Sequence, residues 1–148
     1  NKVIFAAVQT MIARMLSRKP GTKLVLNKWT RDFFNKLDNL KFLSYVGKDG
    51  YPVIIPAIQT QSLDAEHVCF STTVYGDLLV DIPAGAPMAV FNMALTMEDV
   101  LLRGEFLGYR KMAGIKTGVV KIDWVYNPMP PVPGQIYPET VLDPIREF

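Results

Sequence analysis

The sequence predicts a mainly β protein: a six-stranded antiparallel β-barrel with peripheral helices on its N-terminal side. From residue 41 onward, the spacing of apolar residues changes from a helical period to the alternation that is typical of strands. Six apolar segments then follow one another closely, with one short helical interruption. Because parallel strands need a long crossover helix between them, we expect antiparallel strands that close into a small barrel.

The composition is that of a folded protein with a sizeable core. Of the 148 residues, 49% are hydrophobic and 20% are charged, which excludes a disordered chain. The single cysteine, Cys69, lies in an apolar segment, so we expect a buried thiol and a cytoplasmic protein. We divide the chain into residues 1–29, an N-terminal helix and linker that packs on the barrel or on a partner, and residues 30–148, the barrel domain with a proline-rich C-terminal arm.

Two helices are expected before the first strand. Residues 3–13 are too few to span a bilayer, which takes about 20, and we expect no membrane partner. Their spacing predicts an amphipathic helix that packs on the core or on a partner subunit through Ile4, Ala7, Val8, Met11, Ile12 and Met15. The helix is expected to end in the run from Ser17 to Gly21. The second helix covers residues 30–40, with Thr30 as its N-cap and a buried stripe of Phe33, Phe34, Leu37 and Leu40.

Six strands are expected after these helices. Residues 41–46 and 51–60 form a hairpin over a Gly-Lys-Asp-Gly turn. Pro52 and Pro56 cannot donate to a ladder, so the second strand lies at an edge or beside a bulge. The remaining strands are residues 67–73, 88–93, 100–108 and 118–126, and residues 75–82 form a short helical segment.

The end of the chain is dense in proline. Residues 127–138 cannot pair as a central strand, and their apolar side chains predict an extended arm that lies on a surface. This arm either reaches across a dimer or packs back on its own barrel. Trp124 and Tyr126 alternate along one face of the last strand, where we favour a subunit interface over stacking on a flavin.

The net charge of +2 conceals an asymmetry along the chain. Residues 1–50 carry a net charge of +7 and residues 51–148 carry −5. The basic residues are spread over two helical faces and a loop, without an aromatic stacking motif or zinc-ligand spacing, so we expect a solvated surface and no nucleic-acid partner. Pairing between the basic face of one subunit and the acidic face of another is the second interpretation.

Five segments together carry a family resemblance. They read FLSYVGKDGYPVIIPAI, HVCFSTTVYGDLLVDI, PMAVFNM, VLLRGEFLGY and GVVKIDWVY. In this order they resemble the FMN-binding split-barrel family related to pyridoxamine 5′-phosphate oxidase, over roughly residues 30–127. The resemblance implies a split β-barrel, a homodimer, and FMN in a groove between the subunits.

The resemblance also implies a set of flavin contacts. Backbone N–H groups of the second strand are expected along the flavin ring, although barrel core explains the same side chains equally well: Val53, Ile54 and Ile55. Hydroxyls at the end of the third strand are expected near the flavin phosphate, beside the helix that begins near Tyr75: Ser71, Thr72 and Thr73. Hydroxyls and free N–H groups suit a phosphate, but Ser and Thr are also simply common at strand ends.

One position departs from the family pattern. Asp77 stands a few residues after these hydroxyls, where the family usually carries a basic residue. A carboxylate at this place repels a phosphate. Either another cation takes the role, with Lys48, Arg103 and Lys121 as candidates, or FMN binding is weakened or lost.

These observations favour an FMN-dependent oxidoreductase that transfers hydride or electrons to or from a small molecule. Because the flavin supplies the redox chemistry, we assign no catalytic residue. The alternative is a non-catalytic ligand-binding or dimeric interaction module that has lost or altered the flavin site. We expect no metal, since His67 is the only histidine, and a Cys69–His67 pair has no evident third group to orient it.

Overall fold

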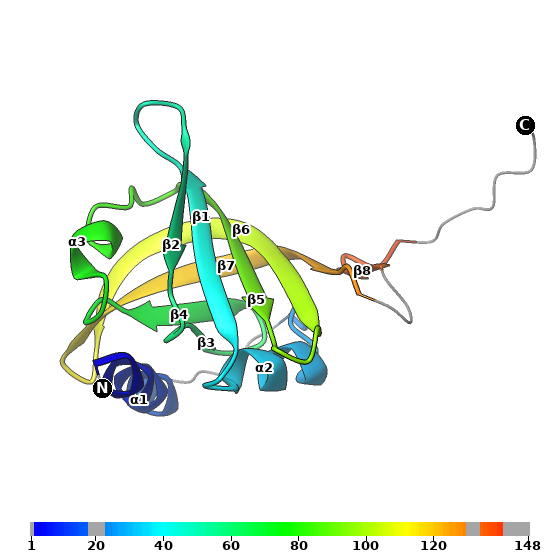
Figure 1. Ribbon diagram of the computed structural model, residues 1–148, viewed down its shortest axis with the longest axis horizontal. Helices are drawn as coiled ribbons and strands as arrows, with labels where there is room; N and C mark the ends of the chain where they lie inside the picture. The colour runs from blue at the N-terminus through cyan, green and yellow to red at the C-terminus, as the bar shows by residue number, and fades with distance from the viewer. Residues whose placement is uncertain (1, 18–22, 130–133, 141–148) are drawn as a thin grey trace, which may run out of the picture.

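A computed structural model describes residues 2–17, 23–129 and 134–140 of the chain. This part of the chain contains three helices and eight strands. The helices are α1 (Lys2–Ser17), α2 (Lys28–Asn35) and α3 (Gly76–Leu79). The strands are β1 (Leu40–Val46), β2 (Pro52–Pro56), β3 (Gln61–Ser62), β4 (His67–Ser71), β5 (Pro87–Met93), β6 (Asp99–Met112), β7 (Ile115–Asn127) and β8 (Gly134–Tyr137). They form one antiparallel sheet in the order β2-β1-β5-β6-β7-β4-β3, with β8 beside β7. The sheet curls into a barrel in Figure 1.

The eight strands correct the expected number of six. The expected strand over residues 51–60 ends at Pro56. The chain then turns, with the Thr60 N–H donating to the Ala57 carbonyl at 2.9 Å, before β3 begins. Strand β8 comes from the proline-dense tail, where Gly134–Tyr137 contains no proline and pairs with β7. This part of the tail therefore packs on its own barrel.

The β6–β7 hairpin is longer than the expected segments 100–108 and 118–126. Its strands have 14 and 13 residues, joined at Ala113 and Gly114, whose φ angles of 51° and 77° suit a tight hairpin turn. Charged side chains occupy the added ladder: Arg110, Lys111 and Lys116. The apolar pattern therefore stops before the backbone pairing does.

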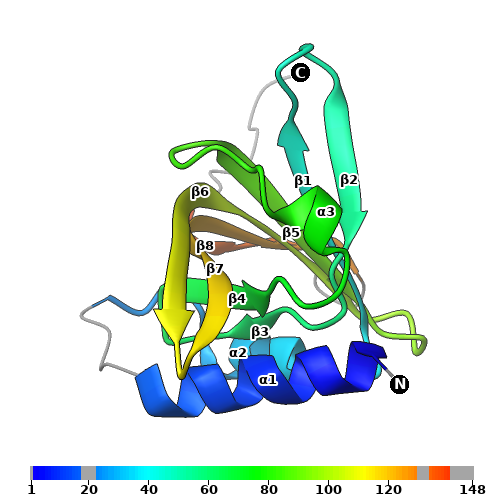
Figure 2. The same ribbon diagram turned by 90° about the vertical axis from the view of Figure 1, so that its left-hand side faces the viewer.

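Helices α1 and α2 lie beneath the barrel in both Figure 1 and Figure 2. Helix α1 contacts β4 and β3, and α2 contacts β3. The core within the barrel joins aromatic residues of α2 and the sheet, including Phe33, Phe34, Phe70 and Phe106. Among the described residues, no helix combines the length and apolar character that crossing a bilayer requires.

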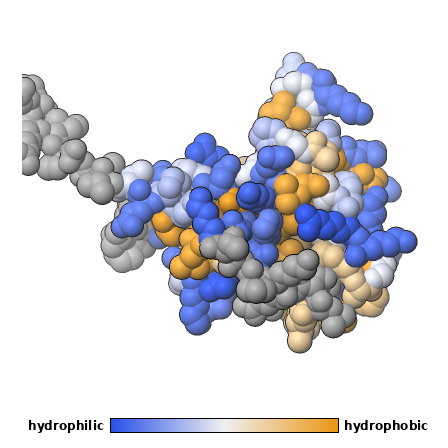
Figure 3. All heavy atoms as spheres, turned by 180° about the vertical axis from the view of Figure 1, so that it is seen from behind, coloured by the Kyte–Doolittle hydropathy of each residue, from blue (hydrophilic) through white to orange (hydrophobic). Residues whose placement is uncertain are grey.

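Helix α1 turns its small residues toward the barrel. The buried residues are Ala6, Ala7 and Thr10, and the exposed large ones are Ile4, Phe5, Met11, Ile12 and Met15. The small residues allow close approach, so that the Ala6 carbonyl accepts the Ser71 hydroxyl at 3.1 Å and the Ala7 carbonyl accepts the Gln61 amide at 2.8 Å. In Figure 3 the lower right, where α1 lies in this reversed view, is coloured pale to deep orange. Of the six residues expected to pack, Ala7 is therefore buried, whereas Ile4, Met11, Ile12 and Met15 are exposed. Residues 18–21 of the expected helix stop lie outside the described residues.

The boundaries of α2 differ from those expected. The side chain of Asn27, rather than Thr30, caps the helix and accepts the Thr30 N–H at 2.8 Å. At the other end, the amides of Asn39 and Asn92 both donate to the Phe33 carbonyl at 3.1 Å. These bonds satisfy a terminal carbonyl, and the helix ends at Asn35. The expected stripe is therefore shorter: Leu37 is 47% exposed and Leu40 belongs to β1.

Lys41 is fully buried beside the segment that follows α2. Its Nζ donates to the carbonyls of Lys36, at 2.7 Å, and Ile58, at 3.2 Å. Burial lowers the pKa of the Lys41 ammonium to about 8, against the weaker opposing influence of Asp38. The lysine therefore links the segment after α2 to the segment after β2, although burying its charge is unfavourable.

Gly104 marks a register shift between β6 and β7. A Cβ at this position would lie 1.8 Å from the backbone oxygen of Lys121, whereas a Cβ at Gly76 would have no neighbour within 4 Å. We expect Gly104→Ala to lower the free energy of unfolding by about 3 kcal/mol or more, because backbone must move. Gly76→Ala, the control, should change it by less than about 1 kcal/mol. Urea denaturation measures both, and equal effects would contradict the packing described.

Lys41→Met tests the buried charge. The folded-state pKa of Lys41 lies below its ordinary value of 10.5, so between about pH 8 and pH 10.5 the unfolded state binds more protons and stability rises with pH. We expect the wild-type free energy of unfolding to rise relative to that of Lys41→Met across this window, by about 3 kcal/mol at most. Lys48→Met, at the exposed hairpin turn, should leave the wild-type slope unchanged. Parallel slopes for wild type and Lys41→Met would show that the buried ammonium keeps an ordinary pKa.

Candidate functional site

Strand β2 leaves one side of the sheet open. Among the described strands it pairs with β1 alone, as its two prolines predicted. The Ala57 N–H donates to the Lys41 carbonyl and the Gly47 N–H to the Tyr51 carbonyl, both at 2.8 Å. Because bonded and non-bonded pairs alternate in an antiparallel ladder, the pair Ser44–Ile54 between them is non-bonded.

This register decides which backbone groups face the open edge. The N–H groups of Val53 and Ile55 turn toward β1, whereas positions 52, 54 and 56 face outward. Because Pro52 and Pro56 carry no N–H, Ile54 supplies the one N–H on the open edge of β2. The Ile55 side chain is core, Val53 packs against that core, and Ile54 is 66% exposed.

The hydroxyls at the end of β4 have different partners. Ser71 is fully buried against α1: its hydroxyl donates to the Ala6 carbonyl and its N–H donates to the Thr10 hydroxyl, both at 3.1 Å. Thr72 donates from its hydroxyl, at 3.3 Å, and from its N–H, at 3.2 Å, to the Lys116 carbonyl. Thr73 is exposed and donates to the side chain of Gln9. Ser71 is thus part of the α1 contact, and the two threonines remain near the surface.

Gln59 joins the open edge to these hydroxyls. This residue follows β2 and is fully buried, and its amide donates to the carbonyls of Ser71, at 3.0 Å, and Val74, at 3.4 Å. Tyr75 follows in the left-handed conformation, with φ of 56°, and precedes α3. The end of β2, the end of β4 and the start of α3 are therefore held at one place.

A lysine that the sequence analysis did not identify lies beside these threonines. Lys116 lies on β7 beside Thr72, and its Nζ is 4.5 Å from the ring centroid of Tyr109. The Tyr109 hydroxyl in turn donates to the Leu79 carbonyl of α3. Lys116 therefore lies between the end of β4 and α3, and only the β4–β7 register brings it there.

The three cations expected to replace the missing basic residue lie elsewhere. Lys48 lines a hollow beneath the hairpin turn together with Asp49 and Asp81. Lys121 pairs with His67 at the start of β4, about 13 Å from its end by strand length. Arg103 lies on β6, opposite Trp124 of β7. None of these three reaches the end of β4 through a contact of the described residues.

The outer face of the sheet carries an apolar row. Phe42, Phe91 and Leu101 are opposite one another on β1, β5 and β6, and Tyr126 continues the row on β7. All four are partly buried but lie outside the core. A hollow of about 390 Å³ lies beside this row and is lined by Ser44, Pro52, Ala89, Arg103, Gly104 and Asp123, among others.

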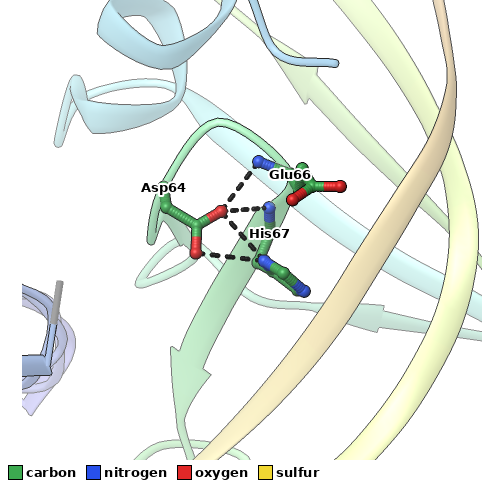
Figure 4. Close-up of polar contacts among 3 residues, drawn as sticks. All are labelled: Asp64, Glu66 and His67. Atoms are coloured by element: carbon green, nitrogen blue, oxygen red, sulfur yellow. Dashed lines mark hydrogen bonds and ion pairs between the residues drawn. The ribbon is translucent and has the colours of Figure 1, made fainter. Parts of the chain in front are cut away.

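His67 and Asp64 form a closed polar cluster at the turn before β4 (Figure 4). The Asp64 carboxylate contacts His67 Nδ1 at 2.9 and 3.0 Å and accepts the N–H groups of Glu66, at 2.7 Å, and His67, at 2.9 Å. Burial raises the pKa of this carboxyl, but the bonds from His67 and Glu66 outweigh burial and lower it. The cluster stabilises a turn. Among the described residues, no three His, Cys, Asp or Glu side chains gather as metal ligands, and Cys69 is buried in a small cluster with Met112.

The fold defines this chain as a split barrel, and comparison with solved structures agrees. No model of a known protein family matches the sequence, and no curated protein does. HupZ of Group A Streptococcus superimposes with a TM-score of 0.58 at 11% identity, over 74% of this chain and 98% of that chain. A provisionally assigned pyridoxamine 5′-phosphate oxidase from Lactobacillus delbrueckii superimposes with a TM-score of 0.54 at 18% identity, over 70% of this chain and 95% of that one. The chain therefore has the split-barrel fold of proteins like pyridoxamine 5′-phosphate oxidase, as its sequence predicted.

Asp64→Asn tests the polar cluster. A carboxyl with a lowered folded-state pKa contributes stability above its ordinary value of 3.8, and this contribution is lost as pH falls below it. The amide keeps an oxygen for the turn, so we expect the stability difference between wild type and variant to be clear at pH 6 and to shrink toward pH 3. Asp49→Asn is the matched control, because Asp49 accepts the Tyr51 N–H in a similar turn at 3.1 Å but without a histidine. A difference that stays constant with pH, measured by urea denaturation, would contradict this account.

Proposed function

We propose that this chain is an FMN-binding split-barrel oxidoreductase that passes hydride or electrons between the flavin and a small organic molecule. The observation that carries the proposal is the junction held by Gln59, where the open edge of β2 meets the end of β4 and α3. One side of this junction offers an unpaired strand edge, and the other offers hydroxyls beside a cation. A flavin mononucleotide needs both: a wall for the ring and a clamp for the phosphate.

The open edge of β2 suits the ring. The Ile54 N–H is a fixed donor, and a donor aimed at the ring edge stabilises the negative charge that develops there on reduction. The bound flavin supplies the hydride or electron chemistry. The protein supplies this donor and an apolar wall that includes the exposed Ile54 side chain.

The end of β4 suits the phosphate through two of the three expected hydroxyls. Thr72 and Thr73 lie near the surface, and the Lys116 ammonium supplies the positive charge that the family pattern lacks at Asp77. Asp77 is exposed, so water screens its repulsion. Ser71 is tied to α1, where its bonds hold the end of β4 in place.

The proposed assembly is a homodimer with two ligand grooves between its subunits. The row of Phe42, Phe91, Leu101 and Tyr126 presents aromatic and aliphatic side chains on an outer sheet face. Aromatic residues of this kind are enriched in subunit interfaces. A two-fold pairing of this face would place a second subunit next to the open edge of β2.

The second candidate function is a non-catalytic module with an altered ligand site. Two features favour it: the Ser71 hydroxyl and N–H are both taken by α1, and the β2 edge retains one N–H. Such a protein would keep the barrel and the dimer but bind another ligand.

Uptake of FMN separates the two functions. We expect the purified protein to bind added FMN with the absorption bands of oxidised flavin, and Thr72→Ala combined with Thr73→Ala to weaken FMN affinity tenfold or more, because each bond to a charged group contributes about 1.5–3 kcal/mol. Lys116→Gln should act in the same direction. Riboflavin, which lacks the phosphate, should bind wild type and variants alike.

Arg110→Gln is the control, because Arg110 lies on the same hairpin but faces the other side of the sheet from Lys116. It should leave FMN affinity near the wild-type value. A colourless protein that fails to take up FMN contradicts the flavin function and favours the second candidate. Unchanged FMN affinity in the threonine and lysine variants refutes the phosphate placement alone.

A further inference from the structure

The hollow on the outer sheet face has the size and the lining of a second ligand site. It measures about 390 Å³ and is formed by five neighbouring strands, from β2 to β7, which is within the size range of small-molecule pockets. Its sheet surface carries small residues, Ser44, Ala89 and Gly104, and its sides include Val46 and Pro52. A floor of small residues leaves a flat surface, against which a planar molecule can lie.

Arg103 lines this hollow and lies against a tryptophan ring. Its guanidinium lies 3.9 Å from the ring centroid of Trp124, which is cation–π distance. The indole N–H of Trp124 donates to the Gln135 side chain of β8 at 2.8 Å, and the ring stacks on Tyr126 with centroids 5.4 Å apart. The Gln135 amide is itself bonded to the Pro138 carbonyl at 2.7 Å. Strand β8 therefore orients the Trp124 ring through a hydrogen bond, and Arg103 packs on that ring.

Two opposite charges in the hollow have no ion-pair partner. Arg103 and Asp123 both line it, and neither forms a salt bridge within the described residues. A guanidinium presents a planar fork that matches a carboxylate in two parallel hydrogen bonds. A carboxylate such as Asp123 accepts hydrogen bonds and repels a doubly charged anion such as a phosphate.

We propose that this hollow binds a small aromatic carboxylate that carries a hydrogen-bond donor, with its ring on the Ala89 surface, its carboxylate on Arg103 and its donor toward Asp123. As the substrate class of the flavoprotein proposed above, this ligand rests on that function. The binding itself needs no flavin, so the two proposals can fail separately.

The probe is 4-aminobenzoate, titrated into flavin-free protein that carries Trp29→Phe, so that Trp124 is the fluorophore. We expect saturable quenching, confirmed by calorimetry, and a loss of affinity of tenfold or more in Arg103→Gln, because a bond to a charged group is removed. Arg103→Lys, which keeps the charge but not the fork, should lose most of the same affinity. Arg110→Gln, at the far end of β6, is the matched control and should bind as wild type does.

Two ligand comparisons test the charges separately. The neutral 4-aminobenzamide should bind at least tenfold more weakly than 4-aminobenzoate to wild type, and equally weakly to Arg103→Gln. Wild type should prefer 4-aminobenzoate over 4-methylbenzoate, and Asp123→Asn should reduce that preference. Circular dichroism establishes that each variant is folded.

The proposal is overturned if 4-aminobenzoate does not bind at millimolar concentration, or if folded Arg103→Gln binds it as tightly as wild type. Protein that takes up FMN but not 4-aminobenzoate contradicts the hollow and leaves the flavin function standing. Protein that binds 4-aminobenzoate through Arg103 but takes up no FMN supports the hollow as a ligand site and contradicts the flavin function.

Discussion

The absence of an N–H at two positions of β2 is the constraint on which the rest of the structure depends. A strand with Pro52 and Pro56 on its outward register cannot pair on both edges, so the curled sheet stays open at β2 and does not close into a continuous barrel. The chain crosses the opening through the segment after β2, where Gln59 bonds to the end of β4. The open edge, the end of β4 and α3 are neighbours for this reason, and every proposal about a flavin depends on their proximity.

Buried polar side chains hold the elements around this opening. Three side chains each donate to backbone carbonyls that are not bonded in a strand ladder. Gln59 donates at the end of β4, Lys41 donates in the segments after α2 and β2, and Asn92 donates in the last turn of α2. An unpaired buried carbonyl costs as much as a lost hydrogen bond. These side chains therefore stabilise the irregular segments more than a purely apolar core would. Lys41 does so with a depressed pKa, which shows the penalty of burying its charge.

Much of the fold was predictable, because it follows from local chemistry. The prolines of β2 predicted an edge strand, the glycine-rich turn predicted the first hairpin, and the motif order predicted a split barrel. The two missed strands have local reasons as well: β3 has two residues, and β8 lies among prolines. For α1, helical spacing predicted the helix, but the face that packs is set by close approach to Ser71, which favours alanine and threonine over larger residues.

The sequence by itself determined the type and order of the elements, the open edge and the residue types available for a site. Tertiary structure alone decided which of those residues meet. Lys116 reaches Thr72 because β4 pairs with β7, and Arg103 is held over Trp124 because β8 folds back on the same strand. Pairing between strands that are distant in sequence depends on the whole sheet, and the register of that sheet assigns each side chain to the core or to a surface. The family resemblance therefore predicted the hydroxyls as a site, but no pattern along the chain pointed to Lys116.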